Sequence, residues 1–263
     1  MNFTVQGKAA FAYTAAHTLD PAKRTIVFIH GAGLDHSLFG LQSRYFGYHG
    51  WNVLALDLPA HGRSEGPPLP SVEGMADWIF EVLNALKIQK ASMVGHSLGS
   101  LVALECAARN PERVERIALI GIAFPMKVGE AFMEAARKNE QAAFDMETIW
   151  GHAAQVPLGG NPNPGMWMYG DALARLARLA PGVLHTDLKA CNDYAAGLSS
   201  AAKVKCPALM ILGKRDVMTP TRGAQQLGAA LKAKTTVIDF SGHSLMAEAP
   251  DATLDALIAF FAS

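Results

Sequence analysis

The amino-acid sequence predicts an α/β fold in which a mostly parallel central sheet is flanked by helices. Short apolar runs bounded by charge or glycine alternate with amphipathic helical segments over most of the 263 residues. One such run leads directly into Gly95-His96-Ser97-Leu98-Gly99 and then into a helix, a sharp strand–turn–helix corner. The chain is long enough for one large domain with a sizeable core, or for a domain with an insertion.

The N-terminal half of the chain supplies the first alternating elements. Residues 3–14 predict a hairpin around Gly7. Continuous apolar runs such as residues 25–29 predict buried strands, and Ser37 and Ser71 are suitable helix caps. Further strands are expected at 52–56, 91–94 and 116–120, and helices at 37–48, 71–86 and 101–108.

The alternation stops between about residues 122 and 203, where no run typical of a strand occurs. Helices are expected there at 128–138, 141–150, 171–179 and 186–196, with a loop at Asn161–Gly165. Strands at 208–212 and 235–240 and helices at 222–231 and 250–261 complete the chain. The expected organisation is a helical cap insertion over the carboxyl edge of the sheet, residues 123–203, between two parts of one core, residues 1–122 and 204–263.

Three polar residues follow predicted strands in the order serine, aspartate, histidine. Ser97 stands between two glycines at the strand–helix corner, Asp216 follows the strand at 208–212, and His243 follows the strand at 235–240. A serine nucleophile needs a base within hydrogen-bond reach and an acid that orients the base. An isolated aspartate or histidine in such a position more often caps a loop, but the three together predict a catalytic triad.

Two backbone N–H groups are expected to stabilise the oxyanion that forms when Ser97 attacks a carbonyl. Leu98, directly after the serine, predicts one donor. His30-Gly31-Ala32-Gly33 follows the strand at 25–29, and its glycines allow the backbone to approach a substrate. Ala32 is the predicted second donor with Gly33 as the alternative, while His30 is expected to be structural.

These segments together resemble the α/β-hydrolase superfamily, in its group of small capped serine hydrolases of carboxylesterase type. The resemblance covers essentially the whole chain outside the insertion and implies the α/β-hydrolase fold with the same triad. In such proteins a segment like Asp57–Ser64 forms a structural turn under the site, and Ala60 stands where many of them carry glycine. The motifs are His30–Gly33, Asp57–Ser64, Gly95–Gly99, Gly213–Asp216, and Gly242 and His243 with Glu248 and Pro250.

The predicted insertion is rich in large, soft side chains, which suit an adaptable apolar pocket. Most of them are expected to form the insertion's own core, and Gly165–Tyr169 is the stretch most expected to face the pocket. Arg175 and Arg178 lie on one helix face and either face solvent or bind a substrate carboxylate. The predicted substrate-binding residues are Gly33, Leu34, Phe124, Met126, Trp150, Trp167, Met168 and Leu245.

The composition gives no sign of a nucleic-acid or membrane partner, because 23 basic and 23 acidic residues leave a net charge of zero. Three cysteines do not make a disulfide framework. No signal peptide or membrane-spanning run is visible, so a cytoplasmic protein is expected. The triad requires no metal or organic cofactor, and the sequence leaves a monomer and a homodimer equally open.

The leading functional prediction is hydrolysis of a carboxylic ester of a small to medium apolar substrate through an acyl-enzyme. Dehalogenase and epoxide-hydrolase chemistry needs a carboxylate where this chain has Ser97. In capped relatives the same triad also cleaves carbon–carbon bonds of ring-fission products, opens enol-lactones or acts as a perhydrolase. A ligand-sensing protein with slow turnover is a further hypothesis, since a fold alone does not set function.

Overall fold

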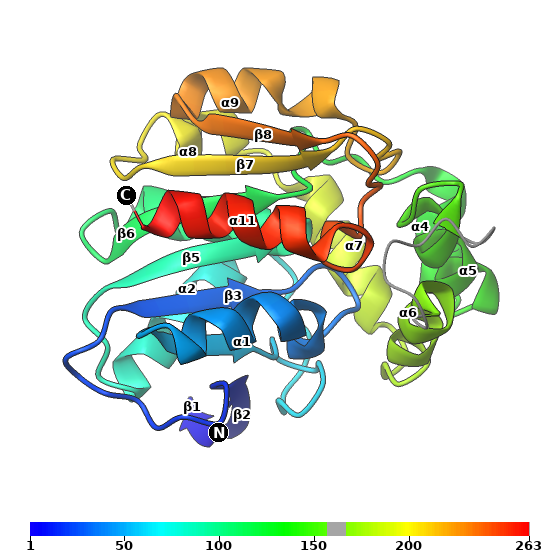
Figure 1. Cartoon of the computed structure of the whole chain (residues 1–263). Coiled ribbons are helices and arrows are strands. Elements are labelled where there is room, and N and C mark those ends of the chain that lie inside the picture. Colours follow the sequence, from blue (N-terminus) through cyan, green and yellow to red (C-terminus); the bar gives the residue numbers. More distant parts are fainter. Residues whose placement is uncertain (157–166, 263) are drawn as a thin grey trace.

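The computed structural model describes residues 1–156 and 167–262 and confirms the predicted α/β fold. In these ranges eight strands form a mostly parallel sheet with helices on both faces (Figure 1). The predicted loop Asn161–Gly165 lies outside the described residues. The strands are β1 (Asn2–Val5), β2 (Lys8–Tyr13), β3 (Thr25–Ile29), β4 (Asn52–Leu56), β5 (Ala91–His96), β6 (Val114–Ile120), β7 (Ala208–Gly213) and β8 (Lys234–Ile238).

The strand order is β1-β2-β4-β3-β5-β6-β7-β8. The β1–β2 and β2–β4 pairs are antiparallel, and every other neighbouring pair is parallel. The central strands β3, β4 and β5 are buried along their whole length, as expected for strands covered on both faces.

The helices mostly follow the predicted periodicity, but the first helix begins differently. Asp35, and not Ser37, provides the cap, because its carboxylate accepts a hydrogen bond from the Ser37 N–H at 2.9 Å. The helices are η1 (His36–Phe39), α1 (Gly40–Tyr48), α2 (Val72–Ala85), α3 (Leu98–Arg109), α4 (Glu130–Arg137), α5 (Gln141–Trp150), α6 (Met168–Leu176), α7 (Val183–Asp193), α8 (Gly197–Ala201), η3 (Thr221–Ala224), α9 (Gln225–Leu231), α10 (Leu245–Glu248) and α11 (Pro250–Phe261).

Two apolar layers hold the sheet between its helices, because successive side chains of a strand point to opposite faces. Phe28 of β3 packs in the layer under α1 and α11, which includes Phe46 and Phe260. Its neighbours Val27 and Ile29 belong to the other layer, under α2 and α3. Figure 1 shows α1 and α11 together on the face nearer the viewer.

The parallel register brings the carboxyl ends of the central strands to one edge of the sheet. Ile29 pairs with Gly95, and His96 pairs with Ile120. Gly213 at the end of β7 pairs with Ile238 at the end of β8. The loops that follow β3, β5, β7 and β8 therefore start beside one another, as the sequence predicts for a catalytic edge.

Helices α4 to α8 all lie in the chain between β6 and β7. Figure 1 shows α4, α5 and α6 beyond the carboxyl ends of the strands. Helix α6 begins at Met168, earlier than expected, and the short α8 was not predicted because its Gly-Leu-Ser-Ser-Ala sequence has weak helix propensity. We refer to α4–α8 as the helical segment.

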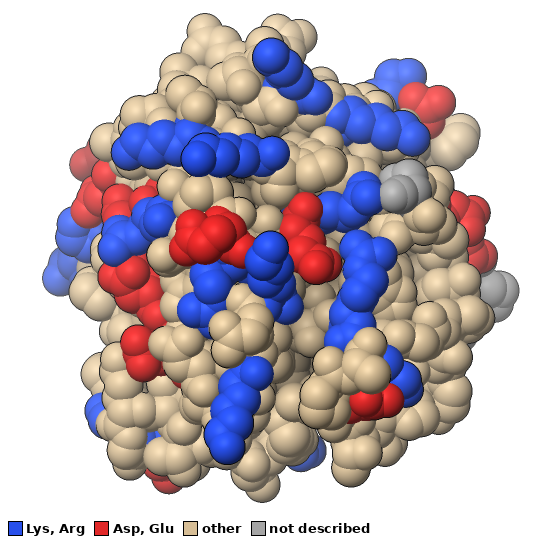
Figure 2. Space-filling view, turned by 90° about the vertical axis from the view of Figure 1, so that its left-hand side faces the viewer, with Lys and Arg blue, Asp and Glu red and all other residues tan. Residues whose placement is uncertain are grey.

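Charged side chains of both signs are interspersed on the face of the molecule turned away from α4–α6 (Figure 2). That face therefore presents no field of a single sign. Among the described residues, no helix has the length and apolar character needed to cross a membrane.

Replacing Gly99 by alanine tests a close approach between two backbone segments of the core. A Cβ at Gly99 would collide with the carbonyl oxygens of Ile29 and His30, which belong to the backbone and cannot rotate away. We expect Gly99→Ala to lower the free energy of unfolding by about 1–3 kcal/mol or more, measured by urea denaturation. The control is Gly40→Ala, where a Cβ meets no atom within 4 Å; equal stability of the two variants would contradict the prediction.

Candidate active site

Ser97 occupies a strained turn between β5 and α3. Its backbone has φ 52° and ψ −116°, a conformation that an L-residue adopts only at a cost, and its N–H donates to the Ile120 carbonyl at 2.9 Å. The flanking Gly95 and Gly99 make this possible, because a Cβ on Gly95 would collide with the backbone of Gly99. The turn places the Ser97 side chain, half-buried, in the wall of a cavity.

His243 and Asp216 form a buried pair beside this turn. His243 Nδ1 lies 2.7 Å from Asp216 Oδ2, so its N–H donates to the carboxylate. Asp216 also accepts hydrogen bonds from the Met218 and Thr219 N–H groups and from the Thr219 hydroxyl. The Gly242 N–H donates to Glu248, which anchors the loop that carries His243. The imidazole is thus held with Nε2 free: in the described part of the chain this buried nitrogen has no hydrogen-bond partner.

The two members of the pair shift each other's pKa in opposite directions. Burial alone would lower the pKa of His243, but the Asp216 carboxylate outweighs burial and raises it above the usual 6.5. Burial alone would raise the pKa of Asp216, but His243 and Thr219 bring it to about 2. The aspartate is therefore ionised at neutral pH, and its charge favours the protonated form of His243.

His96 is a neutral neighbour of this pair. Its ring centroid lies 4.7 Å from that of His243, and its Nε2 is 2.9 Å from the His243 carbonyl oxygen, to which it donates. Burial, followed by the nearby His243, lowers the pKa of His96 to about 3. His96 therefore supports the backbone of His243 without adding a second positive charge.

A cavity of about 340 Å³ contains Ser97 and His243 in its wall. Of the predicted substrate-binding residues it includes Met126 and Trp150, and it also includes the predicted oxyanion donor Ala32. The residues of the wall that were not predicted are Lys127, Val128, Gly129, Phe132, Glu147, Leu188, Cys191, Val217, Met218 and Thr219.

The other predicted pocket residues lie elsewhere. Trp167 is 77% exposed, and Met168 is buried against Ala153 and Val156. Leu245 is buried in the apolar layer that contains α11, because helix α10 turns it toward the core. The structure thus places Trp167, Met168 and Leu245 outside the wall of this cavity, because composition shows that apolar side chains are present but not the direction in which each one points.

Three more predicted pocket residues are also placed outside the cavity wall. The Phe124 ring lies edge-on to Tyr194 with centroids 6.0 Å apart, and it fills the space beside Gly197. Gly33 and Leu34 line a second, separate cavity of about 370 Å³. This second cavity also contains Arg175 and Arg178, which are ion-paired with Asp171 and Asp35 respectively.

Two neighbouring N–H groups in the loop after β3 differ in their hydrogen bonding. The Gly33 N–H donates to Asp187 Oδ2 at 2.8 Å. Among the described residues, nothing accepts a hydrogen bond from the N–H of Ala32, a residue in the cavity wall, or from the N–H of Leu98 at the start of α3. Of the two candidates for the second oxyanion donor, the geometry favours Ala32.

Asp187 also pairs with His61, and the pair is fully buried. His61 Nε2 lies 2.8 Å from Asp187 Oδ2, and Nδ1 lies 3.0 Å from the Pro59 carbonyl oxygen. Both ring nitrogens face acceptors, which calls for the doubly protonated imidazolium. Burial opposes this charge, but Asp187 outweighs it and the pKa of His61 is raised. Asp187 belongs to α7, so this ion pair ties the helical segment to the core.

His30 lies against His61, with ring centroids 4.8 Å apart, and has a structural role. Its Nε2 accepts a hydrogen bond from the Leu58 N–H, and its Nδ1 lies 2.8 Å from the Gly31 carbonyl oxygen. Burial, and then the charge of His61, lowers the pKa of His30 to about 4. The neutral His30 thus joins the loop after β3 to the turn after β4.

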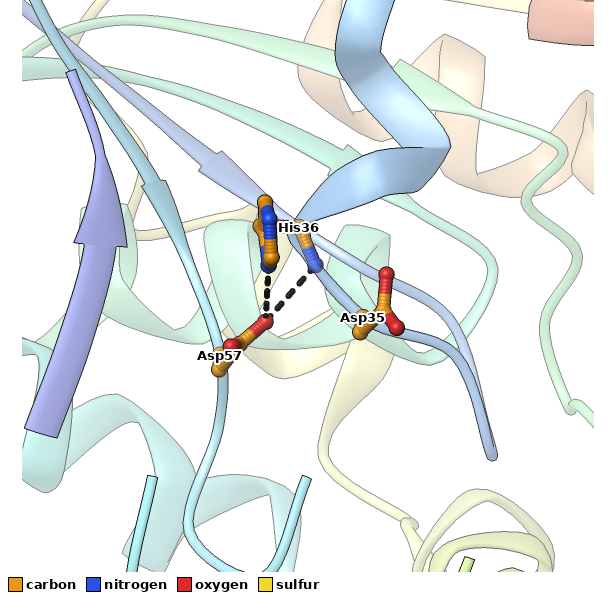
Figure 3. A group of neighbouring side chains, drawn as sticks. All are labelled: Asp35, His36 and Asp57. Atoms are coloured by element: carbon orange, nitrogen blue, oxygen red, sulfur yellow. Dashed lines mark hydrogen bonds and ion pairs between the residues drawn. The ribbon is translucent and has the colours of Figure 1, made fainter. Parts of the chain in front are cut away.

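Asp57 holds that turn together and lies in a small cluster with Asp35 and His36 (Figure 3). Its Oδ1 accepts hydrogen bonds from the N–H and Nδ1 of His36, both at 2.8 Å, and its Oδ2 accepts from the Arg63 N–H. The atoms of these three residues that could bind a metal ion lie within 4.8 Å of one another. However, both oxygens of Asp57 already accept hydrogen bonds within the protein. The cluster is a structural turn, as the resemblance implies for this segment.

Sequence analysis missed Thr219, Asp187 and His61. Thr219 follows Asp216 by three residues, and an aspartate often accepts hydrogen bonds from the backbone two or three residues later. This spacing could therefore have predicted the contact between the two residues. The pairing of Asp187 with His61 spans 126 residues and has no local signal.

Removing the charge of Asp216 should change how His243 titrates. In Asp216→Asn the burial of His243 is no longer outweighed, so we expect its pKa to fall from above 6.5 to below that value. The measurement is an NMR titration of the histidine rings, with His96 as an internal reference that stays neutral over the same pH range. An unchanged pKa of His243 would contradict the coupling to Asp216.

Substitutions of Asp187 separate its two contacts. Asp187→Ala removes the charge that keeps the buried His61 protonated and leaves His61 Nε2 and the Gly33 N–H without their acceptor, so we expect the free energy of unfolding to fall by about 1–3 kcal/mol. Asp187→Asn keeps an oxygen that can accept from the Gly33 N–H and should lose less. Denaturant unfolding monitors both variants, and the exposed Asp193→Asn on the same helix is the control. Wild-type stability of Asp187→Ala would show that the ion pair contributes nothing.

The chain is similar to characterised hydrolases along most of its length. It is 25% identical to an (E)-2-((N-methylformamido)methylene)succinate hydrolase of Acinetobacter baylyi, over 89% of this chain and 89% of that protein. It is 28% identical to a pimeloyl-[acyl-carrier protein] methyl ester esterase of Chromobacterium violaceum, over 78% of this chain and 81% of that protein.

The fold has close structural counterparts as well. The crystal structure of an enol-lactonase from Burkholderia xenovorans matches with a TM-score of 0.86 and 22% identity, over 100% of both chains. Residues 26–256 match the family described as the alpha/beta hydrolase family. This match spans the parallel strands from β3 to β8, the strained serine turn and the loops that carry Asp216 and His243, and the chain therefore belongs to the alpha/beta hydrolase family.

Proposed function

We propose that this protein is a serine hydrolase that cleaves a carboxylic ester of a small to medium apolar substrate. The observation that carries the proposal is the arrangement of three groups at one sheet edge. Ser97, in its strained turn, shares a cavity with His243, whose Nδ1 is 2.7 Å from Asp216 and whose Nε2 is unpartnered among the described residues. In such a serine–histidine–aspartate arrangement the histidine acts as the base that activates the serine.

In this mechanism His243 Nε2 takes the proton of Ser97 as the oxygen attacks the ester carbonyl. The bond from Ser97 Oγ to the carbonyl carbon forms, and the carbonyl electron pair becomes an oxyanion, which the N–H groups of Leu98 and Ala32 stabilise. His243 then gives its proton to the departing alcohol, leaving an acyl-Ser97. Water, deprotonated by His243, attacks the acyl carbon. The bond from that carbon to Ser97 Oγ then breaks, His243 returns the proton to Oγ, and the acid is released.

Asp216 serves this cycle in two ways. It fixes the tautomer in which Nδ1 carries the proton and Nε2 is free to act as a base. Its negative charge also stabilises the imidazolium that forms when His243 accepts a proton, as the raised pKa of His243 indicates. Thr219 holds the carboxylate in the required orientation.

The size and walls of the cavity support an apolar substrate. Met126, Phe132, Leu188, Val217 and Met218 are apolar side chains in its wall. A space of about 340 Å³ suits a small to medium ligand. We propose that the helical segment acts as the cap over this site, since Phe132, Trp150 and Leu188 come from α4, α5 and α7.

The relatives support hydrolysis but do not agree on the type of bond that is cleaved. One named relative is a methyl ester esterase, and one structural counterpart is an enol-lactonase. A lactone is a cyclic ester, so the same attack and oxyanion stabilisation would open it. We therefore propose ester hydrolysis first, with enol-lactone opening as the closest alternative.

The test is steady-state hydrolysis of p-nitrophenyl esters from acetate to decanoate, together with an enol-lactone. We expect multiple turnovers and an optimum at an intermediate chain length set by the cavity. Ser97→Ala should lower kcat by roughly 10⁴–10⁶-fold, because it removes the nucleophile. Retention of the wild-type rate by Ser97→Ala would overturn the mechanism, and turnover of the lactone alone would replace the ester assignment.

A further inference from the structure

Glu147 is a carboxyl group in the wall of the catalytic cavity that the proposed reaction does not use. It lies on α5, one turn before Trp150, and both residues line the cavity together with Ser97 and His243. Its Oε2 atom is buried and makes no hydrogen bond with any residue in the described ranges. Glu147 is therefore a polar group in a mostly apolar wall.

Other buried acidic side chains of the described chain are bonded within the protein. Glu105 Oε2 accepts hydrogen bonds from the hydroxyls of Tyr194 and Ser200, each at 2.7 Å. Glu248 accepts from the backbone N–H groups of Ala153 and Gly242. These carboxylates anchor helices and loops. Glu147 anchors nothing in the described structure, which separates it from the structural carboxylates.

The surroundings of Glu147 are unfavourable to an unpaired charge. Burial raises its pKa to about 7, while the nearby His243 acts in the opposite direction. Buried polar groups are normally hydrogen-bonded, and an exception in a cavity wall gains its partner when a ligand donates a hydrogen bond. A carboxylate accepts such bonds strongly from hydroxyl and amine groups.

We propose that Glu147 is a specificity-determining residue that accepts a hydrogen bond from a hydroxyl or amine group on the substrate. This inference rests on the proposed function and adds a chemical class to it: an otherwise apolar ester that carries one hydrogen-bond donor away from the scissile bond. The surrounding Met126, Phe132 and Leu188 bind the apolar part. A substrate carboxylate at the same position would meet a like charge whenever Glu147 is ionised and would therefore bind less well as the pH rises above 7.

The experiment compares matched ester pairs that differ only in the donor. Each p-nitrophenyl alkanoate is paired with its ω-hydroxy and ω-amino counterparts over the chain lengths that wild type hydrolyses. We expect wild type to prefer, at one chain length, a donor-bearing ester over the plain ester in kcat/KM. Glu147→Leu should reduce the preference about 10-fold or more, because the hydrogen bond to a charged acceptor is lost.

Two further variants make the comparison specific. Glu147→Gln keeps an acceptor oxygen, so it should retain much of the preference for the hydroxy ester and lose that for the amino ester. Asp145→Asn changes an exposed carboxylate on the same helix and should leave both preferences as in wild type. A Glu147→Leu variant that changes the plain and donor-bearing esters equally would overturn the inference while leaving the esterase assignment intact.

Binding of the same ester pairs to Ser97→Ala protein provides a readout that does not depend on turnover. Calorimetry with Ser97→Ala and with Ser97→Ala/Glu147→Leu should show tighter binding of the donor-bearing ester only where Glu147 is present. If wild type hydrolyses no ester, the proposed function fails, and this binding difference alone decides the role of Glu147. Equal affinities of the two proteins for both esters would overturn it.

Discussion

The close approach of the first turn of α3 to β3 and β5 is the constraint on which the rest of the site depends. Only glycine fits at positions 95 and 99, where a Cβ would collide with backbone atoms. The resulting turn forces Ser97 into a positive φ of 52° and points its side chain into the cavity. It also brings Leu98 to the start of α3, beside the loop of Ala32. The proposed nucleophile, the N-terminus of α3 and the loop of the proposed oxyanion donor are thus positioned by one packing contact.

Buried polar contacts then fix the loops around this turn. His30 joins the loop after β3 to the turn after β4. Asp187 of α7 bonds to both, because it accepts a hydrogen bond from the Gly33 N–H in the loop after β3 and pairs with His61 in the turn after β4. The surroundings of each histidine determine its protonation. Burial and the nearby His61 keep His30 neutral, whereas the two acceptors at His61 favour its protonated form. A buried ion pair contributes little net stability but is costly to break, which makes the arrangement specific.

Much of the fold and the reactive groups could be predicted from the sequence, because their signals are local. Apolar runs show buried strands, and the residues directly after them fall at the carboxyl edge whatever the details of packing. Ser97, Asp216 and His243 are of this kind, and the structure brings Asp216 and His243 into contact. The residues of the cavity wall, in contrast, have no such local signal. Trp167 and Phe132 are both large and aromatic, yet one is exposed and the other buried, because helix packing decides the direction of each side chain.

The helical segment is hydrogen-bonded to the core through two of its helices, α5 and α7. The Ser244 N–H donates to the Gly151 carbonyl at the end of α5, and the Gly33 N–H donates to Asp187 of α7. A hinge motion that lifted the whole segment would break at least one of these bonds. Rotation of side chains at the exposed rim, where Lys127 and Val217 lie, would break neither. Exchange of ligand with solvent is therefore expected at this rim, on the time scale of side-chain rotation rather than of domain movement.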